Sequence, residues 1–302
     1  MSAIKNVALA GASGILGKEV LKAFIEAGKF NITILSREDS DATFPATVQV
    51  VKINYDSIDS LTAALQGKDA VISTVTTAAI ASQEPLIRAA AAVGVKRFIP
   101  AEFSSNLANP KAAALLVYAN QIKIQGLLQE TAKSNPEFSY TSIRNGAFLD
   151  WGLALGFQLD LRSENPPFYD GGDRPFSTTT LPTIAKATVA VLDHLPDTRN
   201  RAVYVHDVVT TQRHLLYLAR KVAPERHWEP VSVSTEDLER VARENYKRGE
   251  FGLEASIGFF SRSVFAEGFG GAFERVDNEL LGLGVFGDDD LEILLKGVLG
   301  LE

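Results

Sequence analysis

The sequence predicts an α/β protein of the Rossmann type, with a doubly wound parallel sheet and a smaller, irregular C-terminal lobe. Three observations support this prediction. Short β-branched runs alternate with longer helical runs through the first half, a glycine-rich turn follows the first of these runs, and the pattern becomes irregular in the second half. Short apolar strands separated by helices are typical of right-handed βαβ units, and these units build parallel sheets.

The first half contains six expected strands with helices between them. The strands are expected at Val7–Ala10, Ile32–Leu35, Val48–Ile53, Ala70–Thr74, Arg97–Pro100 and Ser139–Arg144. The helices are expected at Gly17–Ala27, Ser60–Leu65, Pro85–Val93 and Leu115–Lys133. This order is that of an open α/β sheet with helices on both faces.

The second half has a less regular pattern. An irregular stretch with paired prolines and glycines covers residues 164–175, and the Gly- and Phe-rich segment Phe251–Phe273 shows neither helical nor strand period. Helices are expected at Leu181–Leu195, Gln212–Val222, Thr235–Arg248 and Asp288–Leu299, and a strand at Ala202–His206. We therefore predict a Rossmann domain over residues 1–157 and a substrate-binding lobe over residues 158–302, some elements of which return to the main sheet.

Composition narrows the possible functions. The 302 residues are 46% hydrophobic and carry a formal net charge of −7, so the protein has no general attraction for nucleic acid or an anionic membrane. There is no cysteine, and the 4 histidines lack metal-ligand spacing, so no metal site is expected. The first residues lack the layout of a secretory signal, and no apolar run is long enough to span a bilayer. We expect a cytoplasmic protein acting on a small molecule.

The glycine-rich turn predicts a dinucleotide site. Gly11, Gly14 and Gly17 follow the first strand and open the first helix, in the order Gly11-Ala12-Ser13-Gly14-Ile15-Leu16-Gly17. In such a turn the first glycine allows a sharp bend, the second lets a pyrophosphate approach the backbone, and the third lets the helix pack against the strand. The free N–H groups at the start of that helix then face the phosphates, and Ser13, Ile15 and Leu16 belong to the same cradle. The alternative is an ordinary strand-to-helix turn.

Arg37 favours NADP(H) over NAD(H). Folds that prefer NAD place an acidic residue at the end of the second strand to bind the ribose hydroxyls. Here that place holds Ser36 and Arg37, and a guanidinium can bind a 2′-phosphate with two hydrogen bonds. Glu38 and Asp39 follow directly, so pairing with Arg37 or repulsion of the phosphate is one alternative, and a solvated loop arginine is another.

Several motifs together resemble the NmrA-like and isoflavone-reductase-like family of atypical short-chain dehydrogenases, especially its fungal members. The motifs are the glycine turn, Ser36-Arg37, Asp69–Val75, Val95–Phe103, Ser139–Asp150 and Tyr169–Asp173. The resemblance implies an NADP(H)-binding Rossmann domain, a small substrate lobe and a cleft between them. Members of the family reduce small, often aromatic metabolites, and others bind the cofactor and act as regulators without turnover.

The resemblance also implies which residues line the cleft. Thr74, Val75 and Thr76 would border the cofactor, and Glu102, Phe103 and Asn145 would lie near the nicotinamide. Substrate would lie against Phe103, Gly146 and Phe148. Independently of the resemblance, Trp151 and Tyr169 are among the aromatic residues that gather around the lobe junction in the sequence, most of which are expected in the core and a subset of which would face the cleft and contact substrate. Aromatic side chains facing the cleft would form an apolar pocket suited to aromatic or polyketide-like ligands.

The proton donor is not evident. Typical short-chain dehydrogenases use a Tyr-x-x-x-Lys pair, and this chain has none. The resembling reductases use a lysine on the helix before Ser139–Arg144, and here Gln121 holds that position. Lys123 is the nearby lysine, but at about 100° per residue it points roughly 200° away from Gln121. A glutamine can orient a ligand but has no usable proton, so the acid would be another group. The residues considered for the site's chemistry are Gln121, Lys123, Tyr169, Glu102, Lys111 and Tyr118.

Three functions remain open. The first is an NADPH-dependent reductase of a small, largely apolar carbonyl or conjugated metabolite, with NADP(H) as its cofactor. The second is a cofactor-binding redox sensor or regulator, which is the one alternative that requires a protein partner. The third is a redox-neutral isomerase, dehydratase or cyclase on the same fold.

Overall fold

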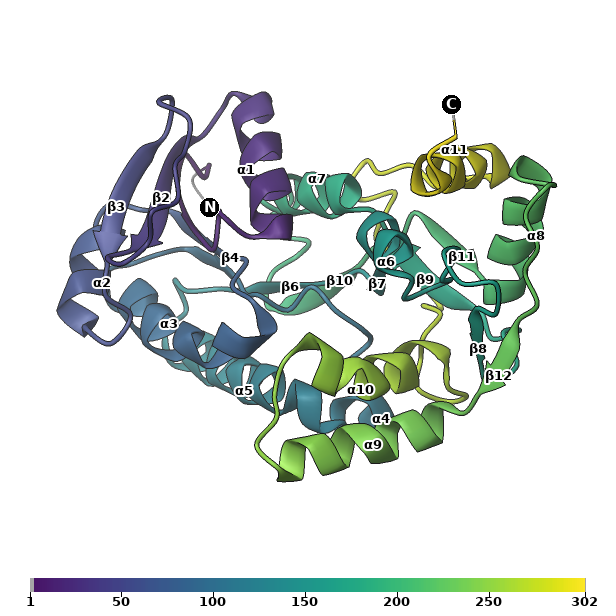
Figure 1. Cartoon of the computed structure of the whole chain (residues 1–302). Coiled ribbons are helices and arrows are strands. Elements are labelled where there is room, and N and C mark those ends of the chain that lie inside the picture. The colour runs from purple at the N-terminus through teal and green to yellow at the C-terminus, as the bar shows by residue number, and fades with distance from the viewer. Residues whose placement is uncertain (1–2, 302) are drawn as a thin grey trace.

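A parallel β-sheet forms the centre of the computed structural model, which describes residues 3–301 (Figure 1). Its strands lie in the order β3-β2-β1-β4-β5, and all neighbours are parallel. They are β1 (Asn6–Ala10), β2 (Asn31–Arg37), β3 (Gln49–Ile53), β4 (Ala70–Ser73) and β5 (Arg97–Ile99). The predicted doubly wound fold is therefore confirmed.

The sheet continues past β5 through a parallel bridge between Phe98 and Tyr140, which leads into β6 (Thr141–Arg144). β10 (Arg201–Tyr204), from the second half of the chain, pairs in parallel with β6. The described residues do not include Met1, Ser2 and Glu302. These residues begin and end the two predicted domains, and the first two also begin the N-terminus in which no secretory signal is expected. The predicted division at residue 157 stays a prediction.

Helices cover both faces of this sheet (Figure 1). α1 (Ile15–Ala27) and α7 (Leu181–Val191) pack together on one face, over side chains such as Val7 and Leu9. The opposite face, which carries Ala8, Ala10 and Val71, is covered by α2 (Ile58–Leu65), α3 (Gln83–Ala92) and α5 (Ala119–Ser134). Successive strand residues point to opposite faces, so β1, β2, β4 and β5 each contribute to two separate apolar cores.

The second half adds small sheets and a group of helices. β7 (Ala147–Phe148), β9 (Phe176–Thr179) and β11 (Val208–Thr210) form one sheet, and β8 (Pro167–Tyr169) pairs with β12 (Val231–Val233). The helices are α6 (Leu149–Leu155), α8 (Gln212–Val222), α9 (Thr235–Lys247), α10 (Leu253–Phe265) and α11 (Asp288–Leu299). The shorter helical segments are η1 (Thr77–Ser82), α4 (Pro110–Ala113) and η2 (Leu116–Tyr118).

The prediction that Phe251–Phe273 is irregular is wrong for its first half, because α10 occupies residues 253–265. Phe259 and Phe265 of this helix belong to different apolar clusters, so the helix is buried on more than one side. A helix buried in this way has apolar residues around much of its circumference and loses a clear period. Gly258 also lets α10 pack closely on α9, since a Cβ at this position would lie 2.0 Å from the carbonyl oxygen of Leu238.

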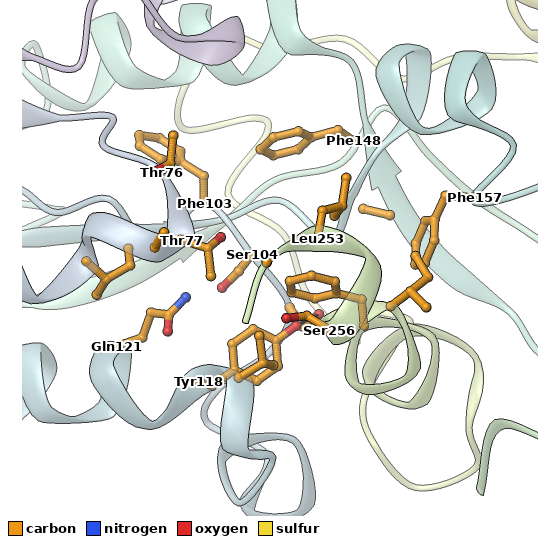
Figure 2. Close-up of a pocket in the computed structure, with 18 of the residues that line it drawn as sticks. Thr76, Thr77, Phe103, Ser104, Tyr118, Gln121, Phe148, Phe157, Leu253 and Ser256 are labelled. Carbon is orange, nitrogen blue, oxygen red and sulfur yellow. Dashed lines mark hydrogen bonds between the residues drawn. The ribbon is translucent and has the colours of Figure 1, made fainter. Parts of the chain in front are cut away.

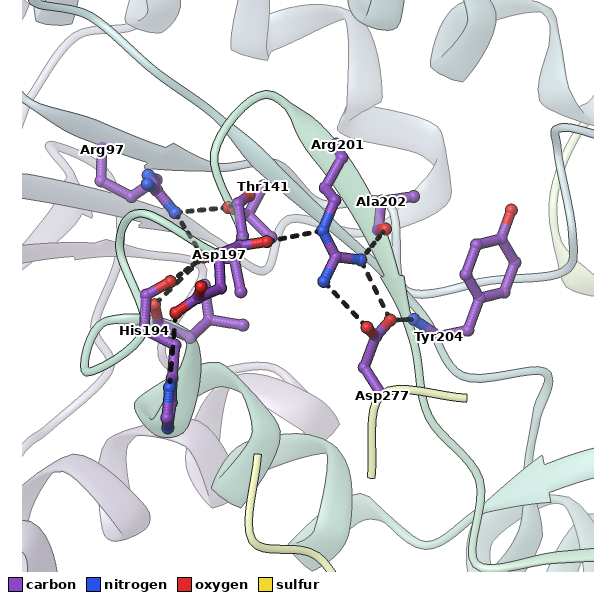
Figure 3. Close-up of polar contacts among 10 residues, drawn as sticks. Arg97, Thr141, His194, Asp197, Arg201, Ala202, Tyr204 and Asp277 are labelled. Carbon is purple, nitrogen blue, oxygen red and sulfur yellow. Dashed lines mark hydrogen bonds and ion pairs between the residues drawn. The ribbon is translucent and has the colours of Figure 1, made fainter. Parts of the chain in front are cut away.

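The side chain of Arg97 lies in the core and connects several segments at the β5 side of the sheet (Figure 3). Its side chain is fully buried, and it donates hydrogen bonds to Ser139 Oγ at 3.0 Å and to the carbonyl of Leu195 at 2.6 Å. It also donates to the hydroxyls of Thr141 at 2.5 Å and Thr198 at 2.9 Å. Burial lowers the pKa of Arg97 to about 10, so the group stays charged at neutral pH. One cation thus joins β5, the start of β6 and the loop after α7.

No helix within residues 3–301 combines the length and the apolar character needed to cross a membrane.

Candidate functional site

A cavity of about 1720 Å³ opens at the carboxyl edge of the central sheet, where the second half of the chain lies against it (Figure 2). The glycine turn and the residues after β4 and β5 form one side of its wall. The η2–α5 segment, the β7–α6 segment and the helices α9 and α10 form the rest. The carboxyl edge of a parallel sheet is where ligands bind in open α/β folds.

The glycine turn fits a bound pyrophosphate. Gly11 has a φ of +81°, and a Cβ there would lie 2.7 Å from the backbone of Thr74. A Cβ on Gly17 would lie 2.1 Å from the carbonyl oxygen of Gly11, so this residue must be glycine for α1 to start where it does. Gly14 is the N-cap of α1 and supplies no capping side chain. The first N–H groups of α1 therefore remain free to bind an anion at its positive end.

Many of the predicted cofactor residues line this cavity. They are Gly14, Ile15, Leu16, Thr74, Val75, Thr76 and Phe103. Gly11 and Gly17 shape the turn from below, as described above. Ser13 lines a neighbouring hollow of about 710 Å³, between α1 and residues 42–45. The dinucleotide cradle and its continuation at the end of β4 are thus brought together by the fold.

Arg37 lies at the end of β2, outside the cavity. Its side chain is 68% exposed, and its Nε lies 3.6 Å from a carboxylate oxygen of Asp39. The pairing with Asp39 that the sequence left open is therefore present. Because both side chains are exposed, the pair is weak and Arg37 can exchange partners.

Glu102 and Asn145 do not line the cavity, although they were expected near the nicotinamide. Glu102 is buried and forms an ion pair with Arg144, whose Nη2 lies 2.5 Å from its carboxylate. The same carboxylate accepts hydrogen bonds from Ser142, at 2.5 Å, and from Gln125. A buried charge is stable only with such partners, so Glu102 is committed to joining β5 with β6 and α5. Asn145 is fully buried, and its backbone carbonyl accepts a hydrogen bond from the hydroxyl of Thr179 at 2.5 Å.

Gln121 and Lys123 point in different directions, as the helix geometry predicts. Gln121 lines the cavity, and its side chain is drawn at the cavity wall in Figure 2. The residue is 5% exposed, and among the described residues no group bonds to its Oε1. The side chain of Lys123 is 73% exposed and pairs with Glu84 at 3.4 Å. The structure therefore does not bring Lys123 to the site, because it lies on the outer side of α5.

The predicted substrate residues all line the cavity: Phe103, Gly146, Phe148, Trp151 and Tyr169. Phe148 and Trp151 pack edge to face with ring centroids 6.1 Å apart, and the ring of Tyr169 stacks on Phe265 at 4.8 Å. Burial raises the pKa of the Tyr169 phenol. Aromatic rings thus dominate this part of the wall, which suits a flat apolar ligand.

Of the other acid candidates, Tyr118 lines the cavity and Lys111 does not. The Lys111 ammonium lies 5.8 Å from the ring of Phe269, away from the cavity. Tyr118 is almost completely buried, and burial raises the pKa of its phenol, while hydrogen bonds with Ser105 and Ser263 and the charge of Arg144 oppose the rise.

The sequence did not point to the wall that α9 and α10 provide. Arg243, Tyr246 and Lys247 of α9 and several residues at the start of α10 line the cavity, among them Leu253 and Ser256 (Figure 2). No motif marks these positions, and α10 itself was not predicted. They line the same cavity as the glycine turn only because the second half of the chain folds back against the first half.

Comparison with known proteins places the chain in a family. The profile of the NmrA-like family matches residues 3–249. Oxidoreductase poxI of Penicillium oxalicum is 33% identical over 290 residues, which cover 91% of this chain and 88% of the relative. Oxidoreductase aprR of Aspergillus flavus is 31% identical over 299 residues, which cover 97% and 99%. Among solved structures, the binary complex of leucoanthocyanidin reductase and NADPH from Vitis vinifera superposes with a TM-score of 0.77 at 21% identity, covering 97% of this chain and 99% of that one. The chain belongs to the NmrA-like family.

Proposed function

We propose that the protein is an NADPH-dependent reductase of a small, largely apolar carbonyl or conjugated metabolite, aromatic or polyketide-like in character. The observation that carries the proposal is a continuous cavity that begins at the glycine turn, passes the end of β4 and ends against aromatic rings. One end suits a dinucleotide phosphate and the other a flat apolar molecule.

The relatives support the same proposal. Both fungal relatives are named oxidoreductases and match almost the whole chain, and the leucoanthocyanidin reductase of similar fold binds NADPH. When bound, the reduced nicotinamide supplies a hydride to the substrate. The residues of this chain would hold the diphosphate at the start of α1, hold the 2′-phosphate at Arg37, and keep water from the aromatic end.

The proposal is tested by following the absorbance of NADPH with purified protein and a panel of acetophenone, 1-tetralone, chalcone and 1,4-naphthoquinone. We expect oxidation of NADPH with at least one aryl ketone or enone, and slower oxidation of NADH. A protein that binds these compounds but oxidises NADPH with none of them contradicts the proposal.

Gln121 favours a second candidate, a cofactor-binding regulator without turnover. The resembling reductases have a lysine where this chain has a buried glutamine, and an amide has no proton to donate. This candidate predicts that the protein discriminates strongly between NADP+ and NADPH in binding, and that one of the two forms releases a protein partner. Measurable turnover together with equal affinity for the two forms excludes it.

A further inference from the structure

Three hydroxyl groups meet beside the cavity. The phenol oxygen of Tyr118 lies 3.0 Å from Ser105 Oγ and 3.0 Å from Ser263 Oγ, and the two serine oxygens are also 3.0 Å apart. They come from the end of η2, from the loop after β5 and from α10, so the cluster forms only when the two halves of the chain come together. Ser263 also donates a hydrogen bond to the carbonyl of Phe260 at 2.9 Å.

The cluster has an inner and an outer side. Tyr118 and Ser105 line the cavity, whereas Ser263 does not and lies behind them. Because the proton of Ser263 is used on the carbonyl of Phe260, this serine can only accept from the other two hydroxyls. The protons of Tyr118 and Ser105 are thus the ones that can turn toward a ligand. Tyr118 lies three residues before Gln121, and both residues belong to the segment drawn below the cavity in Figure 2.

Within residues 3–301 the phenols of Tyr118, Tyr169 and Tyr246 line the cavity, and Tyr118 is the one that lies three residues from Gln121 and forms part of the hydroxyl cluster. Gln121 has no proton to give, and a serine hydroxyl is a far weaker acid than a phenol. Arg243 and Lys247 also line the cavity, but they are paired with Glu239 and Glu244 on α9. We propose that Tyr118 donates the proton to the substrate oxygen, an inference that rests on the proposed reductase function.

The proton and electron balance is complete for a ketone. A hydride from the reduced nicotinamide brings two electrons to the carbonyl carbon, and the C=O π bond opens as its electron pair moves to oxygen. That oxygen takes the proton of the Tyr118 phenol, which gives an alcohol and a phenolate. Ser105, Ser263 and the charge of Arg144 stabilise the phenolate, which takes a proton back from solvent at the end of the cycle. A phenol is protonated at neutral pH, so Tyr118 holds its proton before the transfer. Burial raises the pKa of Tyr118 and so opposes the phenolate, whereas the hydrogen bonds with Ser105 and Ser263 and the charge of Arg144 act against this rise.

The first test is Tyr118→Phe, with the aryl ketone of the panel that the wild type reduces fastest. Ser105 and Ser263 still bond to each other without the phenol oxygen, so we expect this variant to fold. We expect kcat to fall by about 10²–10⁴-fold and the dissociation constant of NADPH to stay the same. The matched control is Tyr140→Phe, which removes another buried tyrosine hydroxyl away from the cavity and is expected to keep the wild-type kcat. The inference is overturned if the Tyr118→Phe variant keeps the kcat of the wild type and also keeps the wild-type solvent isotope effect on kcat.

The second readout needs no turnover. In protein with ¹³C at the oxygen-bearing carbon of tyrosine, the resonance of Tyr118 should shift when 1-tetralone binds in the presence of NADP+, because the carbonyl accepts its O–H. The same resonance in Tyr140 should not move. Binding of the ketone without a shift at Tyr118 overturns the inference even if the phenylalanine variant fails to fold. Absence of any wild-type reduction, by contrast, removes the proposed function itself.

Discussion

The single residue Gln121 shows how a position at the wall of a ligand cavity differs from a position in the apolar core. The residue is only 5% exposed, yet its Oε1 has no hydrogen-bond partner among the described residues. A buried acceptor without a partner costs free energy, and a core position would normally be filled by an apolar side chain. The amide instead faces a cavity where a ligand can provide the missing donor.

Replacing Gln121 by leucine should therefore separate stability from binding. Without the unpartnered amide, the free energy of unfolding of the ligand-free protein should rise by about 1 kcal/mol. The affinity for NADPH should fall, because the ligand loses a hydrogen-bonding partner. Urea unfolding and quenching of tryptophan fluorescence measure the two effects, and a stability that falls together with an unchanged affinity would show that the amide has a structural role.

Arg37 provides the second prediction at this scale. Its exposed pair with Asp39 is worth about 0–1 kcal/mol, while charge-assisted bonds to a phosphate are worth about 1.5–3 kcal/mol each. NADPH should thus displace Asp39 from Arg37. Arg37→Ala should weaken NADPH binding by about tenfold or more and leave NADH binding unchanged, as titration of both cofactors will show. Asp39→Asn should bind NADPH somewhat more tightly, and equal losses for both cofactors in Arg37→Ala would mean that this residue does not read the 2′-phosphate.

Asp69 shows what holds the elements of the sheet in register. It stands just before β4, and its carboxylate accepts hydrogen bonds from the backbone N–H groups of Lys5 and Asn6 and from Lys96 Nζ at 2.6 Å. Burial acts to raise the pKa of this carboxyl, but the hydrogen bonds and the charge of Lys96 outweigh it, and the pKa is lowered. One side chain therefore joins the starts of β1, β4 and β5.

This lowered pKa predicts a pH-dependent contribution to stability. A carboxyl whose pKa is lower in the folded state stabilises the fold above its ordinary pKa of 3.8, and this contribution disappears as the pH falls through the folded value. Asp69→Asn should destabilise the protein by about 1–3 kcal/mol at neutral pH. The difference from the wild type should shrink as the solution is acidified below the ordinary pKa. Urea titrations at a series of pH values measure it, and a difference that is constant across the series would refute the electrostatic explanation.

At the scale of the whole molecule, two buried or half-buried arginines attach the second half of the chain to the sheet (Figure 3). Arg97 binds the loop after α7, and Arg201 of β10 pairs with Asp277 at 2.8 Å, which also accepts a hydrogen bond from the backbone of Tyr204. The cavity lies between these two halves. Its shape thus depends on attachments that are remote from it.

Arg97→Met is the matching prediction. The substitution keeps much of the side-chain volume but leaves the Leu195 carbonyl without its charged donor, and we expect a loss of about 1–3 kcal/mol in the free energy of unfolding. Thermal and urea unfolding measure this loss. Arg88→Met, at an exposed pair with Glu84, serves as a control and should change stability by no more than about 0.5 kcal/mol. Similar effects of the two substitutions would contradict the structural role given to Arg97.

The sequence by itself determined the features that depend on local geometry. Gly11, Gly14 and Gly17 predict the cradle because their spacing and the flanking strand and helix are enough to build it. The opposite directions of Gln121 and Lys123 follow from 100° per residue on one helix. Only the tertiary structure decided the features that depend on distant segments. Glu102 is withdrawn from the cavity by Arg144, α10 is helical because its surroundings bury it on several sides, and the Tyr118 hydroxyl meets Ser263 across 145 residues of chain. A local sequence pattern reflects the conformation of the nearby backbone and can therefore be read from the sequence. Contacts between distant segments depend on which segments the folded core brings together, and no local pattern carries that information.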